Sequence, residues 1–144
     1  MSAAYAGDLT PQEAWDLLAA DPSAVLVDVR TEGEWLTIGV PDTTTLDTEA
    51  GPRSAFVQWV DGSGRPNPLF LDELTALGLE PGGDRPVLLL CRSGVRSVAA
   101  ANAATAAGLG PVYNVLTGFE GDVGPDGQRG HHGWRAAGLP WRQA

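Results

Sequence analysis

Residues 86–110 read PVLLLCRSGVRSVAAANAATAAGLG, and this segment decides the fold. The first five residues form an apolar run, as expected of a strand buried on both faces. The alanine-rich part from 96 to 107 predicts a helix that Gly108 ends. The only cysteine of the chain, Cys91, stands where the apolar run stops and a polar turn begins. The segment therefore predicts a strand, a tight loop and a helix, with a thiol at the carboxyl end of the strand.

The same alternation of strands and helices extends along the rest of the chain. Thr10, Pro11 and Glu13 form the pattern of a capping box with proline at the first helical position, which predicts a helix start. Alternating elements indicate an α/β fold with a central, mostly parallel sheet flanked by helices. We expect strands over residues 24–29, 86–90 and 111–116 with a weaker one over 43–46, and helices over 11–20, 31–35, 67–77 and 96–107 with a short helical segment at 134–137.

The composition restricts the classes of function. The chain has 144 residues, 43% of them hydrophobic, which is enough to bury one continuous core. Its net charge of −9 repels nucleic acid and anionic membranes, so we expect neither as a partner. The first residues show neither the basic cluster nor the apolar core of a secretory signal, and no apolar run approaches the roughly 20 residues that a bilayer requires. We therefore expect a cytoplasmic protein.

A single cysteine excludes an intramolecular disulfide and a zinc site built on cysteines. Cys91 is then either an inert buried thiol or a reactive one. The start of a helix, the nearby Arg92 and Arg96, and the backbone freedom of Gly94 all favour a thiolate held by inward-pointing amides. We expect a nucleophilic sulfur at the bottom of an anion-binding cradle. The residues of that cradle would be Arg92, Ser93, Gly94, Val95, Arg96 and Ser97.

Three segments resemble the rhodanese-like sulfurtransferases. Residues 91–97, C-R-S-G-V-R-S, resemble the active-site loop of that family. Asp28-Val29-Arg30 followed by Glu34-Trp35 resembles its D-V-R-x-x-x-E-[WFY] segment, and residues 116–121 resemble its glycine-rich segment after the last strand. The resemblance implies a single rhodanese-like domain over residues 10–121. We expect residues 1–9 to form an N-terminal tail, and residues 122–144 a glycine-rich C-terminal extension packed on the domain.

The resemblance also implies a reaction. Cys91 would take a sulfane sulfur from an anionic donor, either thiosulfate or a low-molecular-weight persulfide, and hold it as a persulfide. The acceptor would be cyanide or a thiol, with a protein as a possible acceptor, and no cofactor or metal would take part. Arg92 and Arg96 would attract an anionic donor such as thiosulfate, against the negative charge of the whole chain.

Other titratable residues have two interpretations each. Arg30, at the end of the first predicted strand, either reaches the pocket or pairs with Asp28 to stabilise the loop, and we favour the ion pair because such pairs are common. His131 and His132 lie in a glycine-rich segment without a third metal ligand, which favours a solvated loop.

Two other functions use related features. Thiolate phosphatases and arsenate reductases place an arginine after the cysteine in a C-x5-R pattern, whereas four residues separate Cys91 from Arg96 here. The shorter loop favours a sulfur atom over a tetrahedral oxyanion. A non-catalytic docking module of the same fold is the second alternative. Such modules commonly lose the cysteine, which this chain retains.

Overall fold

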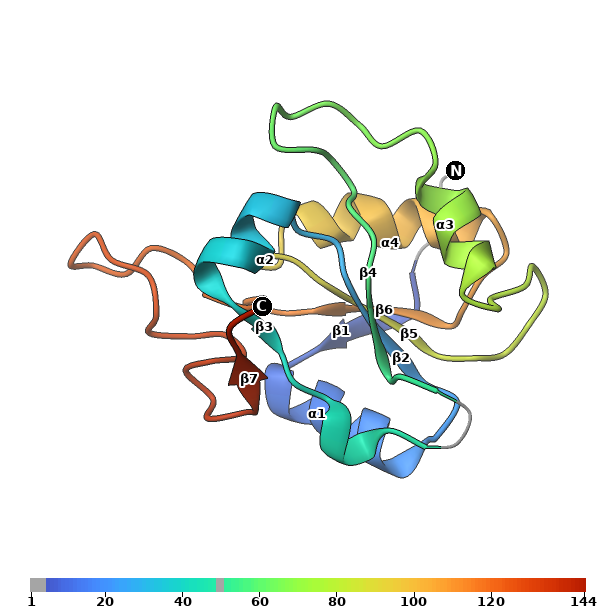
Figure 1. Ribbon diagram of the computed structural model, residues 1–144, viewed down its shortest axis with the longest axis horizontal. Coiled ribbons are helices and arrows are strands. Elements are labelled where there is room, and N and C mark those ends of the chain that lie inside the picture. Colours follow the sequence, from blue (N-terminus) through green and yellow to red (C-terminus); the bar gives the residue numbers. More distant parts are fainter. Residues whose placement is uncertain (1–4, 49–50) are drawn as a thin grey trace.

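A computed structural model describes residues 5–48 and 51–144, and its centre is a five-stranded parallel sheet (Figure 1). The strands lie in the order β1-β6-β5-β2-β4, and every neighbouring pair is parallel. The predicted α/β fold with a mostly parallel central sheet is confirmed. The strands of this sheet are β1 (Gly7–Leu9), β2 (Val25–Asp28), β4 (Ser54–Phe56), β5 (Val87–Leu90) and β6 (Val112–Val115).

Four helices flank this sheet (Figure 1). They are α1 (Pro11–Ala20), α2 (Glu32–Ile38), α3 (Phe70–Ala76) and α4 (Arg96–Ala106). The predicted capping box starts α1, and a second one starts α2, where Thr31 and Glu34 exchange the same two hydrogen bonds. The segment predicted as one helical turn at 31–35 is therefore a longer helix. By contrast, α4 begins without a hydrogen bond from any capping side chain.

The core has two layers because side chains alternate along the strands. All residues of β2 and β5 are buried, as expected of central strands in a parallel sheet. One layer packs against α3 and α4 and contains Val25, Val27, Val29, Val87, Leu89, Cys91, Phe70, Leu74, Ala100 and Ala104. The other packs against α1 and the C-terminal segment and contains Leu26, Leu88, Leu90, Ala14, Leu18, Phe119 and Trp134.

The elements predicted over 43–46 and from residue 67 differ in the structure. The strand expected over 43–46 is wrong, because Thr44–Leu46 forms a 3-10 turn. The Asp42 carboxylate accepts hydrogen bonds from the amide and hydroxyl of Thr44, which bends the backbone away from an extended strand. The helix expected from residue 67 begins later, at Phe70, because the Asn67 side chain accepts from the Leu69 amide and forms a turn.

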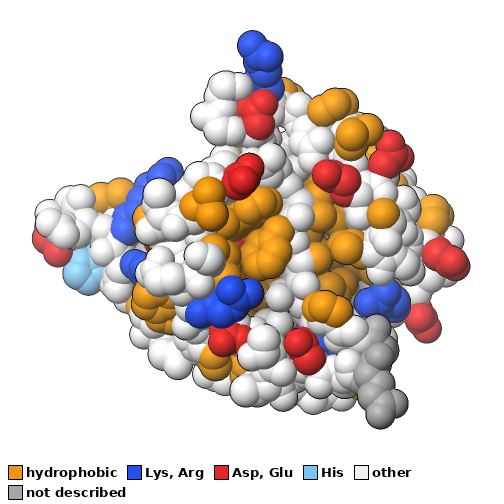
Figure 2. Space-filling view, viewed as in Figure 1, with side chains coloured by type: hydrophobic (Ala, Val, Ile, Leu, Met, Phe, Trp, Pro, Cys, Tyr) orange, Lys and Arg blue, Asp and Glu red, His pale blue; other side chains and the backbone are white. Residues whose placement is uncertain are grey.

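β4 is a strand that the sequence analysis missed, inside the connection expected only to be ordered. It has three residues and forms an edge of the sheet by pairing with β2. On the face drawn in Figure 2, apolar side chains gather around β4, and charged side chains of both signs are scattered about them. Phe56 of this strand is 39% exposed and packs edge-on against Trp35, with ring centroids 5.3 Å apart. A short, half-exposed edge strand produces only a weak sequence pattern.

Both ends of the chain make structure that was not predicted. Residues 7–9 belong to β1 at the other edge of the sheet, so a tail over 1–9 is wrong for these residues, and residues 1–4 lie outside the described part. The expected short helix at 134–137 is a series of turns instead. A second, antiparallel sheet joins β3 (Val40–Pro41) to β7 (Trp141–Arg142). Trp134 is fully buried in the core layer beside α1.

Within residues 5–48 and 51–144, no helix is long and apolar enough to span a bilayer.

Candidate active site

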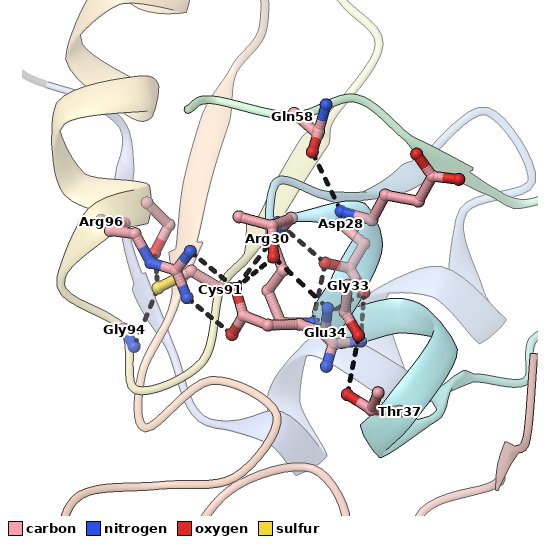
Figure 3. Close-up of polar contacts among 12 residues, drawn as sticks. Asp28, Arg30, Gly33, Glu34, Thr37, Gln58, Cys91, Gly94 and Arg96 are labelled. Carbon is pink, nitrogen blue, oxygen red and sulfur yellow. Dashed lines mark hydrogen bonds and ion pairs between the residues drawn. The ribbon is translucent and has the colours of Figure 1, made fainter. Parts of the chain in front are cut away.

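Cys91 directly follows the carboxyl end of β5. It is the first residue of the segment 91–97, which we call the 91–97 loop. Its Sγ accepts a hydrogen bond from the Gly94 amide at 3.1 Å, and the Ser97 hydroxyl lies 3.2 Å away (Figure 3). Among the described residues, Gly94 is the only member of the loop whose amide donates to the sulfur, so the ring of amides expected from 92 to 97 is reduced to one. The side chain of Cys91 is 1% exposed.

Asn114, which the sequence analysis missed, orients Ser97. It is a buried polar residue of β6, and its Nδ2 donates to the carbonyl of Gly94 and to the carboxylate of Asp8. Its Oδ1 therefore faces Ser97 and accepts a hydrogen bond from the hydroxyl. Ser97 then offers its oxygen to the thiol of Cys91. A polar residue between the valines of a buried strand was the available sequence signal.

Arg96 is paired with Glu34 of α2 and is not a free cation. Its two terminal nitrogens donate to the two carboxylate oxygens at 2.8 and 2.9 Å, and both side chains are partly buried (Figure 3). Burial is the largest single influence on the pKa of Glu34 and opposes ionisation, but hydrogen bonds from Arg96 and Thr31 outweigh it and lower that pKa below its ordinary value. The hydrogen bonds to Glu34 raise the pKa of Arg96, against the effect of burial. Both groups are ionised at neutral pH and their charges cancel.

The remaining loop residues lie nearer the solvent. Arg92 is exposed, and its guanidinium makes no hydrogen bond or ion pair with the part of the chain that the structure describes. Val95 is 71% exposed, and Ser93 is partly exposed. The structure thus brings Gly94 and Ser97 to the sulfur and leaves one unpaired cation, Arg92, at the surface of the loop.

Asp28 and Arg30 form the ion pair favoured from the sequence. Arg30 is fully buried, and its Nε and Nη2 donate hydrogen bonds to the Asp28 carboxylate, with an Nη2–Oδ2 distance of 2.7 Å. Nη2 also donates to the carbonyl of Gly39, and the guanidinium carbon lies 4.3 Å from the centre of the Phe119 ring. Phe119 in turn donates its amide to the carbonyl of Cys91 at 2.8 Å. The Asp28–Arg30 pair therefore supports the 91–97 loop on the side that faces away from solvent.

His131 and His132 are both exposed. His131 is exposed and pairs with the Asp126 carboxylate at 3.0 Å. In the described ranges, no three residues of His, Cys, Asp or Glu are grouped so that they could hold an ion.

The glycine-rich segment 116–121 holds the loop in place through its backbone. The amides of Phe119 and Glu120 donate to the carbonyls of Cys91 and Arg92. Gly118 has a positive φ of 57°, and a Cβ atom there would lie 2.6 Å from the carbonyl carbon of Arg92 and closer still to the carbonyl oxygen of Cys91. Only glycine allows the two backbone segments to approach this closely.

Gly118→Ala should therefore both destabilise the protein and displace the loop. We expect a loss of about 2–3 kcal/mol in the free energy of unfolding, measured by urea denaturation, because a left-handed backbone and a backbone clash add together. Gly127→Ala is the matched control, since Gly127 also has a positive φ, 77°, but nothing within 4 Å of its added Cβ. The control should lose only about 1 kcal/mol. Equal losses in the two variants would show that the close approach at Gly118 is unimportant.

Comparison with known proteins identifies the family. The family model of the rhodanese-like domain matches residues 10–123. The chain belongs to the rhodanese-like domain family. A relative from Rickettsia rickettsii, described as an uncharacterized RP600 homolog, is 34% identical over 130 residues, which cover 90% of this chain and 92% of the relative.

Solved structures share the fold of this chain. The crystal structure of Rv0390 from M. tuberculosis superposes with a TM-score of 0.86 at 50% identity, covering 98% of this chain and all of that one. The polysulfide-sulfur transferase homodimer of Wolinella succinogenes superposes with a TM-score of 0.63 at 23% identity, covering 96% and 78%. A Rhodopseudomonas palustris protein described as a possible tyrosine phosphatase reaches 0.57 at 24% identity, covering 94% and 84%. The last two show a shared fold.

Proposed function

We propose that this rhodanese-like chain is a sulfurtransferase in which Cys91 carries the transferred sulfur. The observation that carries the proposal is the position of the thiol. Its sulfur lies at the carboxyl end of the central strand, where the Gly94 amide donates to it and the Ser97 oxygen lies 3.2 Å away. Crevices at the carboxyl ends of parallel strands are where α/β proteins bind ligands.

The start of α4 supports an anionic intermediate at this place. Both α1 and α2 begin with a capping box, whereas α4 has no capping side chain. The first amides of α4 are therefore without a side-chain partner and can stabilise negative charge on a thiolate or persulfide.

The proposed reaction has two balanced steps. The Cys91 thiolate attacks the outer sulfur of a donor, a new S–S bond forms, and the donor's own bond to that sulfur breaks with the electron pair leaving on the donor remainder. An acceptor nucleophile, either cyanide or a thiolate, then attacks the outer sulfur of the Cys91 persulfide and releases the Cys91 thiolate. The sulfane sulfur is only passed on, so no external oxidant or reductant is required. The Wolinella protein, which has the same fold, is described as a polysulfide-sulfur transferase, and this supports the proposed reaction class.

Intact-mass spectrometry tests the proposal directly. Incubation with a sulfur donor should raise the mass of the whole chain by one sulfur atom, and later addition of cyanide should remove it with formation of thiocyanate. Since Cys91 is the only cysteine, the added atom can be assigned to it. A chain that gains no sulfur from either thiosulfate or a persulfide would contradict the proposal and favour the docking-module alternative.

The phosphatase alternative is weakened by the same geometry. A phosphoryl group in transfer needs donors around three equatorial oxygens. Here four residues separate Cys91 from Arg96, and the guanidinium of Arg96 is already bound by Glu34.

We therefore expect no Cys91-dependent turnover of an aryl phosphate under conditions where sulfur transfer proceeds. Inserting one glycine after Gly94 should widen the loop and reduce sulfur transfer. Steady aryl-phosphate turnover that requires Cys91, or full sulfur transfer by the insertion variant, would overturn this assignment.

A further inference from the structure

The ion pair between Glu34 and Arg96 changes the charge of the candidate active site. Resting on the proposed function, we propose that Glu34 selects against oxyanion donors, so that the donor is a low-molecular-weight persulfide and not thiosulfate. The sequence analysis left both donors open and counted both arginines of the 91–97 loop as attractive charges. In the structure, Arg96 is ion-paired with the carboxylate of Glu34, which reaches the loop from α2 (Figure 3).

A count of the charges around the loop gives the first argument. The guanidinium of Arg96 is matched by Glu34, and that of Arg30 is matched by Asp28 in the layer behind. Arg92 is the one loop cation without an ion pair among the described residues, and it is exposed, so solvent and salt screen it. The whole chain adds a net charge of −9. The site therefore offers a dianion little electrostatic attraction.

The leaving groups of the two donor classes give the second argument. When the Cys91 thiolate attacks thiosulfate, the S–S bond breaks and sulfite leaves as a dianion with three charged or polar oxygens. When it attacks a persulfide R–S–S⁻ that has gained a proton on its outer sulfur, the leaving group is a thiolate with one charge on one atom. Stabilising the sulfite dianion would need cations that the Glu34 pairing has removed.

The burial of the nucleophile gives the third argument. Cys91 is 1% exposed, so a donor must present its outer sulfur on a narrow end. The atom behind that outer sulfur is a divalent sulfur in a persulfide, whereas in thiosulfate it carries three oxygens. The persulfide therefore presents the narrower end to the buried sulfur of Cys91.

The negative charge of Glu34 is not required for its local role. Glu34 Oε1 accepts from the Thr31 amide and hydroxyl in the capping box of α2, and glutamine serves equally well at this position of a capping box. Glu13 makes the same backbone contact with Thr10 in α1, and among the described residues no arginine forms a hydrogen bond or ion pair with it. The charge of Glu34 therefore acts on Arg96, and Glu13 provides a matched control for the capping function.

The test compares donor ratios in four proteins: wild type, Glu34→Gln, Glu13→Gln and the double variant Glu34→Gln/Arg96→Gln. Rates of sulfur loading onto Cys91 are measured with cysteine persulfide and with thiosulfate. Each rate is divided by the rate at which the same donor reacts with free cysteine. The donor ratio is the normalised rate with the persulfide over the normalised rate with thiosulfate. We expect wild type to favour the persulfide by about tenfold or more, the effect of about one poorly screened charge. Glu34→Gln should shift the ratio toward thiosulfate by about tenfold.

The controls separate charge from shape. Glu13→Gln should keep the wild-type ratio, and the double variant, which restores the wild-type net charge of the pair, should return close to it. The proposal is overturned if Glu34→Gln leaves the ratio unchanged, if the double variant keeps the full shift, or if wild type shows no preference after normalisation. If circular dichroism shows that Glu34→Gln is unfolded, the persulfide-to-thiosulfate ratio of the wild type alone tests the proposal. Loading by neither donor would instead contradict the proposed sulfur transfer.

Discussion

Cys91→Ser should abolish sulfur loading while leaving the fold intact. We expect the rate of sulfur transfer to fall by at least about 10³-fold, as for loss of a nucleophile in other covalent mechanisms. Serine can keep the hydrogen bond from the Gly94 amide and the contact with Ser97, so the free energy of unfolding should change by only about 1 kcal/mol. Intact mass after donor treatment measures the first quantity, and thermal unfolding followed by circular dichroism measures the second.

The two measurements together keep this prediction decisive. A folded Cys91→Ser protein that still converts cyanide to thiocyanate would exclude Cys91 as the sulfur carrier. A variant that unfolds would show that the thiol is mainly a packing residue of the first core layer, the interpretation in which Cys91 is an inert buried group.

Arg30→Met should produce the largest loss of stability among single substitutions near the site. Methionine keeps the apolar stem of the arginine side chain but leaves the Asp28 carboxylate, which is 1% exposed, without its cation. Removing one partner of a buried ion pair costs about 3–5 kcal/mol, because the other charge stays buried and unpaired. Phe119 would also lose the guanidinium that stacks on its ring. Denaturant unfolding measures the loss.

Two controls identify the cause of that loss. The double variant Asp28→Asn/Arg30→Met buries no charge and should be more stable than Arg30→Met alone. Asp126→Asn breaks an exposed pair with His131 and should change the free energy of unfolding by less than about 1 kcal/mol. If the double variant is the less stable of the two, the uncompensated carboxylate is not the source of the effect.

The sequence predicted the elements whose signals are local. The capping box at Thr10 and the apolar runs of β2 and β5 depend on neighbouring residues, and all three were found where expected. The strand-loop-helix around Cys91 belongs to the same class, since an apolar run, a glycine and an alanine-rich helix follow in direct succession. The motif therefore located the thiol at the correct end of the sheet.

Short edge strands were not predictable in the same way. β1 and β4 have three residues each, and they exist because a neighbouring strand supplies hydrogen-bond partners from a distant part of the chain. At Thr44–Leu46 a strand was predicted that does not form. The threonines favour a strand, but the Asp42 side chain bonds to Thr44 and turns the backbone.

By itself the sequence determined the fold class, the position of the thiol and the family of the chain. Only the tertiary structure decided the electrostatics of the site, because the partner of Arg96 is Glu34, 62 residues away, and the residue that orients Ser97 is Asn114 on another strand. A residue's charge can be read from its type, but whether that charge is available depends on which side chain the fold brings within hydrogen-bond distance. That pairing depends on how the fold brings Glu34 of α2 to Arg96 at the start of α4, which no local pattern of residues encodes.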